Sequence, residues 1–226
     1  MPITENLTQL RKRLNAACQR SGRDPAHIKL IAVSKTFSAA AIEEAIDAGI
    51  TDIGENRVQE AKEKYALIKK PLRWHLVGHL QTNKVKDAIK IFNVIHGLDS
   101  LHLAQEIQKR ALDPINCLIE INTSGEKTKF GVEPETALEL AKSILNLDKI
   151  KLIGLMTIGP GWAIEDPEAS RPCFKMLRAI KMDLAQVLGL ELSELSMGMT
   201  SDFEIAIEES ATMIRIGTAI FGSRQK

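Results

Sequence analysis

The sequence predicts a single α/β domain, a (β/α)8 barrel of the TIM type in which an N-terminal helix completes the outer ring. Eight apolar runs of strand length alternate with helical patterns along the 226 residues. Such alternation is typical of βαβ units and of a parallel sheet. Runs such as residues 152–156 are apolar at consecutive positions, as expected for strands that are covered on both faces. Eight such units in a chain of this length favour a closed barrel.

The chain begins with an amphipathic pattern over residues 3–21. Ile3, Leu7, Leu10 and Leu14 recur at helical spacing, and basic residues lie between them. The sequence leaves no room for a full helix after the eighth apolar run. We therefore expect the N-terminal helix to occupy that place in the outer ring.

The strands and the later helices are predicted in alternating order. Strands are expected at residues 28–34, 51–55, 73–80, 92–98, 115–122, 151–158, 192–199 and 213–221. Helices are expected at residues 38–49, 56–69, 83–90, 100–111, 134–146, 168–188 and 202–210. Ser38 suits an N-cap, Pro134 suits a first helical position, and Gly189 suits a helix end.

A doubly wound open sheet is the alternative fold. That fold requires a glycine-rich turn after the first strand, and residues 34–37 (Ser-Lys-Thr-Phe) do not form one. No linker, repeat or low-complexity segment divides the chain. We therefore expect residues 1–226 to form one domain.

The composition is that of a soluble globular protein, with 44% hydrophobic and 26% charged residues. The net charge of +1 gives no indication of nucleic acid or of an anionic membrane as a partner. The three cysteines are far apart, so neither a disulfide framework nor a zinc site is predicted. We expect a cytoplasmic protein without a signal peptide. The alternating charges at residues 60–64 predict a solvated helix face.

Lys35 is the first candidate for chemistry, because it ends the apolar run at residues 28–34. The functional residues of barrels lie at the C-terminal ends of the strands. Desolvation lowers the pKa of a lysine, and a neutral amine can form a Schiff base with an aldehyde or ketone. The alternative is a lysine that ends a strand and reaches water, since lysine is rarely buried. The rest of the chain decides between these two interpretations.

Strands 7 and 8 end in small and hydroxyl-bearing residues, at Met199-Thr200-Ser201 and Ile216-Gly217-Thr218. Loops after these two strands often bind phosphate in barrels, and small residues let backbone N–H groups approach an anion. The predicted helix that begins near Ser201 could direct its N-terminus at the same anion. The alternative is a purely structural role in capping and packing. The joint occurrence of both motifs favours phosphate.

Arg215 lies within an apolar strand, and strand alternation puts it on the same face as Met213 and Gly217. If this face points into the barrel, the buried guanidinium needs an acceptor. That acceptor is either a ligand or a carboxylate on a neighbouring strand, such as Glu55 or Glu120. The five histidines form no pattern that is typical of a metal site. An amine, an anion cradle and a guanidinium together suit a phosphorylated aldehyde, either pyridoxal 5′-phosphate or a sugar phosphate.

These residues resemble those of the pyridoxal phosphate homeostasis proteins, over almost the whole chain. The matching motifs are AVSKT at 32–36, GEN at 54–56, WHLVGHLQTNK at 74–84, GLMT at 154–157, SMGM at 196–199, Asp202, and RIGTAIFG at 215–222. The resemblance implies a fold-type-III barrel, similar to the N-terminal domain of alanine racemase. It also implies pyridoxal 5′-phosphate as the cofactor, bound to Lys35 as an aldimine.

The remaining cofactor-binding residues follow from the resemblance only. Arg215 is expected to face the pyridine nitrogen, and Asn56 and Met199 to lie beside the ring. Ser196, Thr200, Gly217 and Thr218 are expected around the phosphate. Thr200 stands where the family pattern leads us to expect serine, and its hydroxyl keeps the donor. Neither catalytic residues nor a metal site are predicted.

The resemblance implies a monomeric cofactor carrier or buffer, without established catalysis, that contributes to vitamin B6 and amino/keto acid homeostasis. Expected partners are the cofactor and pyridoxal-phosphate-dependent apoenzymes. A low-activity amino-acid racemase is the first alternative, although the second domain and the tyrosine base of alanine racemase are not expected here. The one tyrosine, Tyr65, falls in a charged helical segment. A cofactor-free Schiff-base aldolase is the second alternative.

Overall fold

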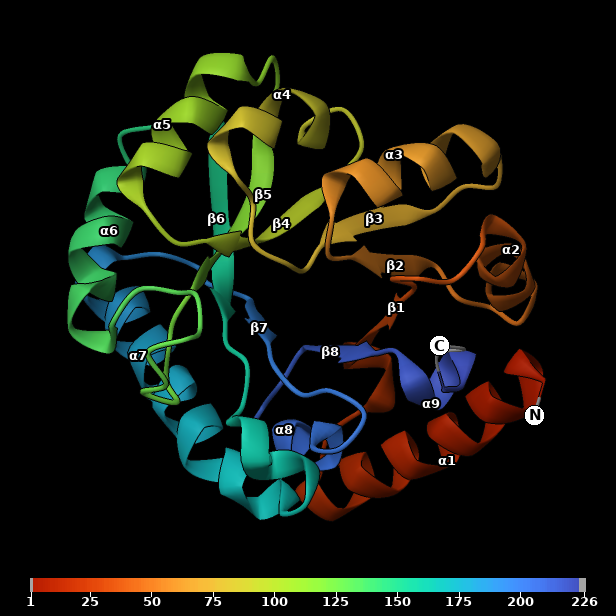
Figure 1. Ribbon diagram of the computed structural model, residues 1–226. Coiled ribbons are helices and arrows are strands. Elements are labelled where there is room, and N and C mark those ends of the chain that lie inside the picture. The colour runs from red at the N-terminus through yellow and green to blue at the C-terminus, as the bar shows by residue number, and fades with distance from the viewer. Residues whose placement is uncertain (1, 224–226) are drawn as a thin grey trace.

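The computed structural model describes residues 2–223, in which eight parallel strands form a closed barrel surrounded by helices (Figure 1). The strands pair in chain order, and β1 closes the barrel by pairing with β8. Their bounds are β1 (Lys29–Val33), β2 (Asp52–Glu55), β3 (Arg73–Leu76), β4 (Val94–Leu98), β5 (Ile115–Glu120), β6 (Ile150–Met156), β7 (Glu194–Ser196) and β8 (Met213–Ile216). The predicted barrel is confirmed, and the doubly wound open sheet is excluded.

The helices lie between the strands, close to the predicted positions. Their bounds are α1 (Ile3–Ser21), α2 (Ala39–Asp47), α3 (Val58–Leu67), α4 (Val85–Ala88), α5 (Leu101–Arg110), α6 (Ala137–Ile144), α7 (Arg171–Leu188), α8 (Phe203–Glu208) and α9 (Thr218–Phe221). Ser38 caps α2, since its Oγ accepts a hydrogen bond from the Ala41 N–H at 3.3 Å. Gly189 ends α7 in the left-handed conformation, at φ +64°.

The eighth strand is shorter than its apolar pattern predicts. The prediction extended it from residue 213 to 221, whereas β8 ends at Ile216 and a short helix follows. Gly217 turns the chain, because its carbonyl oxygen accepts hydrogen bonds from the backbone N–H groups of Ile220 and Phe221. Ile214 and Ile216 of β8 and Ile220 of α9 are all buried, so periodicity alone does not separate this strand from the helix.

The N-terminal helix completes the outer ring, as predicted. In Figure 1, α1 lies along α8 and α9, and these elements are in contact. Leu7, Leu10 and Leu14 are buried on its inner face. Ion pairs connect its exposed face to α8, as between Arg13 and Glu204 at 3.1 Å. Helix α1 therefore covers the part of the sheet that the short α9 leaves open.

Most of the hydrophobic core lies between the barrel wall and the surrounding helices. Inside the barrel, the apolar residues form two small clusters. One contains Ile31, Val33, Val77 and Met213, and the other contains Val94, Leu118 and Met156. The rest of the interior is polar, with buried histidine, serine, glutamate and arginine side chains. This polar interior connects the two ends of the barrel.

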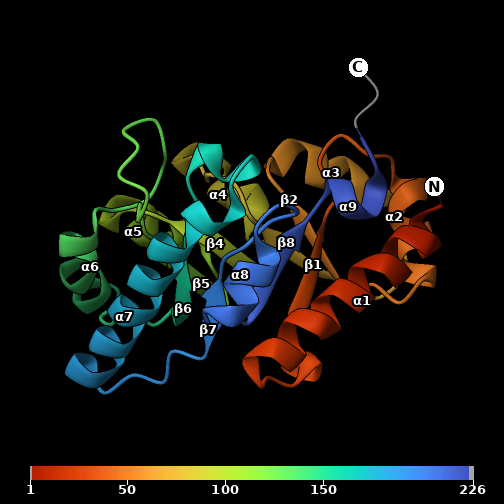
Figure 2. The same cartoon turned by 90° about the horizontal axis from the view of Figure 1, so that it is seen from below.

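The two ends of the barrel differ in their connections. The C-terminal ends of the strands point upward in Figure 2, toward the loops that lead into the outer helices.

The cysteines of the chain are buried and unpaired. Within residues 2–223, no group of histidine, cysteine and acidic side chains is placed to bind a metal. None of the described helices is both long enough and apolar enough to span a membrane.

Candidate functional site

Lys35 lies at the C-terminal mouth of the barrel, two residues after β1, and is half-buried. The chain turns sharply there. Thr36 has the left-handed φ of +71°, and the Phe37 N–H donates to the Ser34 carbonyl at 3.0 Å. A non-glycine residue in this conformation is uncommon and needs support from its surroundings. That support comes from helix α3.

A buried ion-pair network lies beneath this turn. Lys64 of α3 is only 7% exposed and donates to the carboxylates of Glu55 at 2.6 Å and Glu60 at 2.7 Å. It also donates to the Ser34 carbonyl at 2.7 Å. Glu60 in turn accepts a hydrogen bond from the Thr36 backbone N–H. The network therefore holds the backbone on both sides of Lys35 in place.

This network corrects one expectation from the sequence. The charged segment at residues 60–64 is not simply a solvated helix face, because its last lysine points inward against β1 and β2. The Glu60–Lys64 spacing of four residues was visible in the sequence and is typical of a helical ion pair. The third member, Glu55, comes from another element, so helical spacing did not indicate it.

Arg215 is buried inside the barrel with only 4% of its surface exposed, on the same face as Met213, as strand alternation predicts. Its Nη1 donates to Ser196 Oγ at 2.7 Å, and its Nη2 donates to the Thr157 carbonyl at 2.8 Å. Burial lowers the pKa of this guanidinium to about 10. The group is therefore a cation held by neutral acceptors.

Neither of the carboxylates considered for Arg215 forms an ion pair with it. Glu55 instead forms an ion pair with Lys64 and accepts a hydrogen bond from the Ser34 hydroxyl. Glu120 is placed near enough to influence the pKa of Arg215, yet no hydrogen bond joins the two side chains. The guanidinium thus keeps N–H donors that are available to a ligand.

Residues that follow β7 and β8 in the chain meet at the same mouth of the barrel. The Thr218 hydroxyl donates to the Thr200 hydroxyl at 3.2 Å. Gly217 lies between β8 and α9, and a Cβ atom there would contact the Val33 carbonyl oxygen at 3.4 Å. The structure thus brings the predicted phosphate-binding residues of two strands together with the end of β1.

The loop after β7 is held by a buried carboxylate. Asp202 accepts from the Met199 backbone N–H at 2.7 Å and from the Ser170 hydroxyl at 2.6 Å. The Asp202 side chain does not cap α8; it fixes the loop that carries Thr200. The Met199 side chain is exposed at the loop surface.

The last two predicted residues lie at different depths. Asn56 follows β2 directly and is half-buried at the barrel mouth. Its backbone packs closely on the next strand's end, since a Cβ on Gly78 would be 2.6 Å from the Asn56 carbonyl oxygen. Ser196 lies inside the barrel, where its hydroxyl contacts His96 at 2.9 Å and Arg215 at 2.7 Å. Its predicted contact with a phosphate stays a prediction.

Glu120 is a further polar residue of this end of the barrel, considered from the sequence only as an ion-pair partner. It is 5% exposed, and its Oε2 has no hydrogen-bond partner among the described residues. Burial and, to a lesser extent, the charge of Asp99 raise the pKa of Glu120 to about 7, although Arg215 opposes this shift. It lines a cavity of about 140 Å³ together with Asn122, Lys129, Phe130 and Thr157.

Comparison with known proteins agrees with this geometry. Residues 5–225 match the family described as alanine racemase, N-terminal domain. A protein of Aquifex aeolicus is 46% identical over the whole of both chains, and one of Pseudomonas aeruginosa is 43% identical over 98% of this chain and 96% of its own. Both are named pyridoxal phosphate homeostasis protein. The chain belongs to this family.

Solved structures of similar proteins give the same fold. PipY of Synechococcus elongatus, with pyridoxal phosphate (PLP) bound, is 35% identical with a TM-score of 0.85, covering 97% of this chain and all of PipY. A protein of unknown function from Bifidobacterium adolescentis is 36% identical with a TM-score of 0.88, over 97% and 94% of the two chains. Alanine racemase of Clostridium difficile, at 18% identity and a TM-score of 0.73, shares the fold, with 97% of this chain aligned to 58% of the racemase.

The residues at the barrel mouth fit the cofactor bound by PipY. Lys35 offers an amine beside a rigid turn, and Thr200 and Thr218 offer two hydroxyls within hydrogen-bond distance of each other. Arg215 offers a buried guanidinium whose protein partners are a hydroxyl and a carbonyl oxygen. The amine is complementary to the aldehyde of the cofactor, and the two hydroxyls are complementary to its phosphate. The guanidinium is complementary to its ring nitrogen.

Proposed function

We propose that this protein binds pyridoxal 5′-phosphate at the C-terminal mouth of its barrel and carries or buffers it, thereby contributing to vitamin B6 and amino/keto acid homeostasis. The observation that supports this most strongly is the position of Lys35. Its backbone is held from both sides by the Lys64 network, at the end of the first strand. The names of the relatives and the bound PipY structure support the same proposal.

Each predicted residue has a distinct role in this proposal. The Lys35 amine holds the cofactor covalently through its aldehyde. Thr200, Thr218 and the backbone at Gly217 would hold the phosphate, and Asn56 and Met199 would lie beside the ring. Ser196 would hold the Arg215 guanidinium, to which its hydroxyl is hydrogen-bonded. Arg215 donates to the pyridine nitrogen and keeps its own proton, because a guanidinium remains charged at physiological pH. The ring nitrogen then stays unprotonated, which weakens the cofactor as an electron sink.

We further propose a monomeric, single-domain protein of the cytoplasm that delivers the cofactor to apoenzymes and catalyses no reaction of its own. Arg215 supports the absence of catalysis, for the reason just given. Tyr65 supports it too, because this one tyrosine of the sequence is 46% exposed on α3, where its ring packs edge-on against Trp74. It is not placed to act as a base at the barrel mouth.

A low-activity amino-acid racemase is the second candidate, and Glu120 favours it. A buried carboxyl with a pKa of about 7, near Arg215, could exchange protons at neutral pH. The cofactor-free aldolase is separated from both candidates by absorbance, because an aldolase would purify without the visible band of a bound cofactor. A chiral assay with common amino acids separates carrier from racemase.

We expect the loaded protein to transfer its cofactor to an added apoenzyme, with amino-acid racemisation, transamination and decarboxylation staying near background. Reactivation of a pyridoxal-phosphate-dependent apoenzyme, followed over time, measures the transfer. Saturable turnover of one amino acid that is lost in Lys35→Ala would contradict the carrier and establish an enzyme. A cofactor that is retained in the presence of excess apoenzyme would contradict the carrier as well.

Removal of either threonine hydroxyl should weaken binding of pyridoxal 5′-phosphate by roughly tenfold to a hundredfold, because a hydrogen bond to a charged group contributes about 1.5–3 kcal/mol. The variants are Thr200→Ala and Thr218→Ala, whose hydroxyls are 3.2 Å apart. Pyridoxal, which lacks the phosphate, is the control ligand. It should bind the wild-type protein and both variants with the same affinity. Equal weakening for both ligands would show that the threonines support the fold and do not hold phosphate.

A further inference from the structure

A continuous chain of hydrogen bonds crosses the interior of the barrel. It begins at Asp52 Oδ1, which is 2.9 Å from His75 Nε2, and continues from His75 Nδ1 to His96 Nε2 at 2.9 Å. His96 Nδ1 is 2.9 Å from Ser196 Oγ, which accepts from Arg215 Nη1 at 2.7 Å. All five side chains are buried. The chain joins four strands, β2, β3, β4 and β7, to β8.

The direction of every hydrogen bond in this chain follows from its two ends. Arg215 can only donate and an ionised Asp52 can only accept. Ser196 therefore accepts from Arg215 and donates its own proton to His96 Nδ1. His96 must then carry its proton on Nε2 and donate to His75 Nδ1, and His75 must carry its proton on Nε2 and donate to Asp52. Both histidines are neutral in this arrangement, and both are Nε2–H tautomers.

The surroundings of the two rings favour the neutral form. Burial lowers the pKa of His75, and Arg73 and Lys29 lower it further, although Asp52 acts in the opposite sense. Burial also lowers the pKa of His96 well below its usual value, and the neighbouring His75 and Arg215 add to this effect. A proton added to either ring would break the sequence of donors and acceptors. The chain is therefore in a single protonation state at neutral pH.

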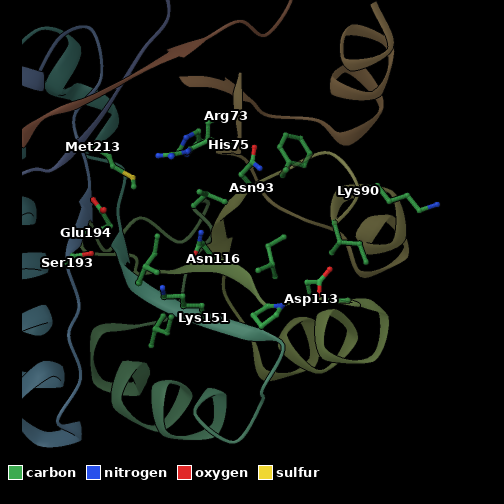
Figure 3. A pocket seen from close by; sticks show the side chains of 18 of the residues that line it. Arg73, His75, Lys90, Asn93, Asp113, Asn116, Lys151, Ser193, Glu194 and Met213 are labelled. Atoms are coloured by element: carbon green, nitrogen blue, oxygen red, sulfur yellow. The ribbon is translucent and has the colours of Figure 1, made fainter. Parts of the chain in front are cut away.

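The chain also reaches the opposite end of the barrel from the proposed cofactor site. His75 forms part of the wall of a cavity of about 880 Å³ at the N-terminal ends of the strands. Figure 3 shows this cavity, with Arg73 and Asn93 beside His75, and Glu194 and Lys151 farther around the wall. The two ends of the barrel are thus joined by hydrogen bonds through a polar interior.

We propose that Asp52, His75, His96 and Ser196 form a positioning chain that holds the Arg215 guanidinium in one orientation toward the cofactor. This proposal rests on the proposed function, in which Arg215 donates to the pyridine nitrogen. Hydrogen bonds in series polarise one another, so a Ser196 hydroxyl that donates to His96 is a better acceptor for Arg215. The chain ends in a carboxylate, which increases this polarisation. None of the first three residues needs to touch the cofactor.

The first arm of the test uses the protein without cofactor. Nitrogen-resolved NMR of the histidine rings should show His75 and His96 as neutral Nε2–H tautomers that do not titrate between about pH 6 and 9. His27 and His102 are exposed, and their signals provide the comparison within the same spectra. An Nδ1–H tautomer at either buried ring, or titration of either ring in this range, would overturn the proposal without any reference to the cofactor.

The second arm interrupts the chain at a residue three hydrogen bonds away from Arg215. His75→Phe keeps an aromatic ring of similar size, and His102→Phe on the exposed face of α5 is the matched control. Ser196→Ala removes only the hydroxyl next to Arg215, with Ser193→Ala as its control. We expect Ser196→Ala to weaken cofactor binding roughly tenfold and His75→Phe by a smaller factor. Both should shift the pH titration of the bound cofactor's absorbance, and both controls should behave as wild type.

The titration distinguishes positioning from mere support of the fold. Variants that are less stable but titrate as wild type, with unchanged cofactor affinity, would overturn the positioning role. If His75→Phe does not fold, the Ser196→Ala variant and the NMR measurement still test the positioning role. If the wild-type protein binds no pyridoxal 5′-phosphate at all, the proposed function and the positioning role fall together. In that case the NMR arm still shows whether the hydrogen-bonded chain exists.

Discussion

Lys35→Ala is expected to abolish covalent binding of pyridoxal 5′-phosphate while the barrel stays folded. The lysine follows β1 at the mouth and is half-buried, so its side chain adds little to the core. The turn around it is held by Lys64, Glu60 and backbone hydrogen bonds that the substitution leaves in place. We therefore expect the free energy of unfolding to change by about 1 kcal/mol or less. The visible absorbance of the bound cofactor should disappear.

Borohydride reduction followed by peptide mapping measures this directly. In the wild-type protein the pyridoxyl label should be found on the peptide that contains Lys35. Lys84→Ala, in the 3-10 turn that precedes α4, is the matched control and should keep the full label. A label on another lysine, or a Lys35→Ala protein that still labels fully, would show that the cofactor is attached elsewhere.

Glu120→Gln is expected to make the cofactor-free protein more stable at alkaline pH, by up to about 3 kcal/mol. Burial is the main cause of the raised pKa of Glu120, about 7 against an ordinary 4.5. In the unfolded chain the carboxyl loses its proton near its ordinary pKa, whereas the folded protein retains the proton up to about pH 7. The folded wild-type protein therefore loses stability between about pH 4.5 and 7, and the penalty is complete above that range.

Glutamine resembles the protonated carboxyl and does not ionise. Wild type and Glu120→Gln should therefore have similar stability near pH 4.5, and the difference should grow until about pH 7 and then stay constant. Urea denaturation at a series of pH values measures this, with Glu135→Gln on the surface as the control for the substitution itself. A difference that does not change with pH would show that the carboxyl is not held in its protonated form by burial.

The two predictions concern opposite sides of the same barrel end. Lys35 is at the end of β1, and Glu120 is at the end of β5. The turn that carries the lysine is held by the ion pairs of Lys64, whereas Glu120 forms no ion pair and its Oε2 has no hydrogen-bond partner among the described residues. The first tests where the cofactor is attached, and the second tests the electrostatics of the wall opposite.

Residues that follow one another along a strand were predictable from the sequence. The end of an apolar run placed Lys35 at the barrel mouth, and the alternation of side chains placed Arg215 on the same face as Met213. The structure shows that this face is the inner one. These predictions succeed because a buried strand has a period of two and its end is marked by the return of polar residues. The number of such runs also determined the barrel, since eight βα units suit a closed parallel sheet.

Contacts between strands depended on the tertiary structure. His75 is opposite Val94 in the β3–β4 register, which places His96 two residues farther along on the same face. No pattern within either strand specifies that register, so the sequence left both histidines without a role. The same holds for Lys64, whose partners come from β2 and from its own helix. Local periodicity determines the face on which a side chain lies. Its contacts with other strands and helices depend on how those elements pack together.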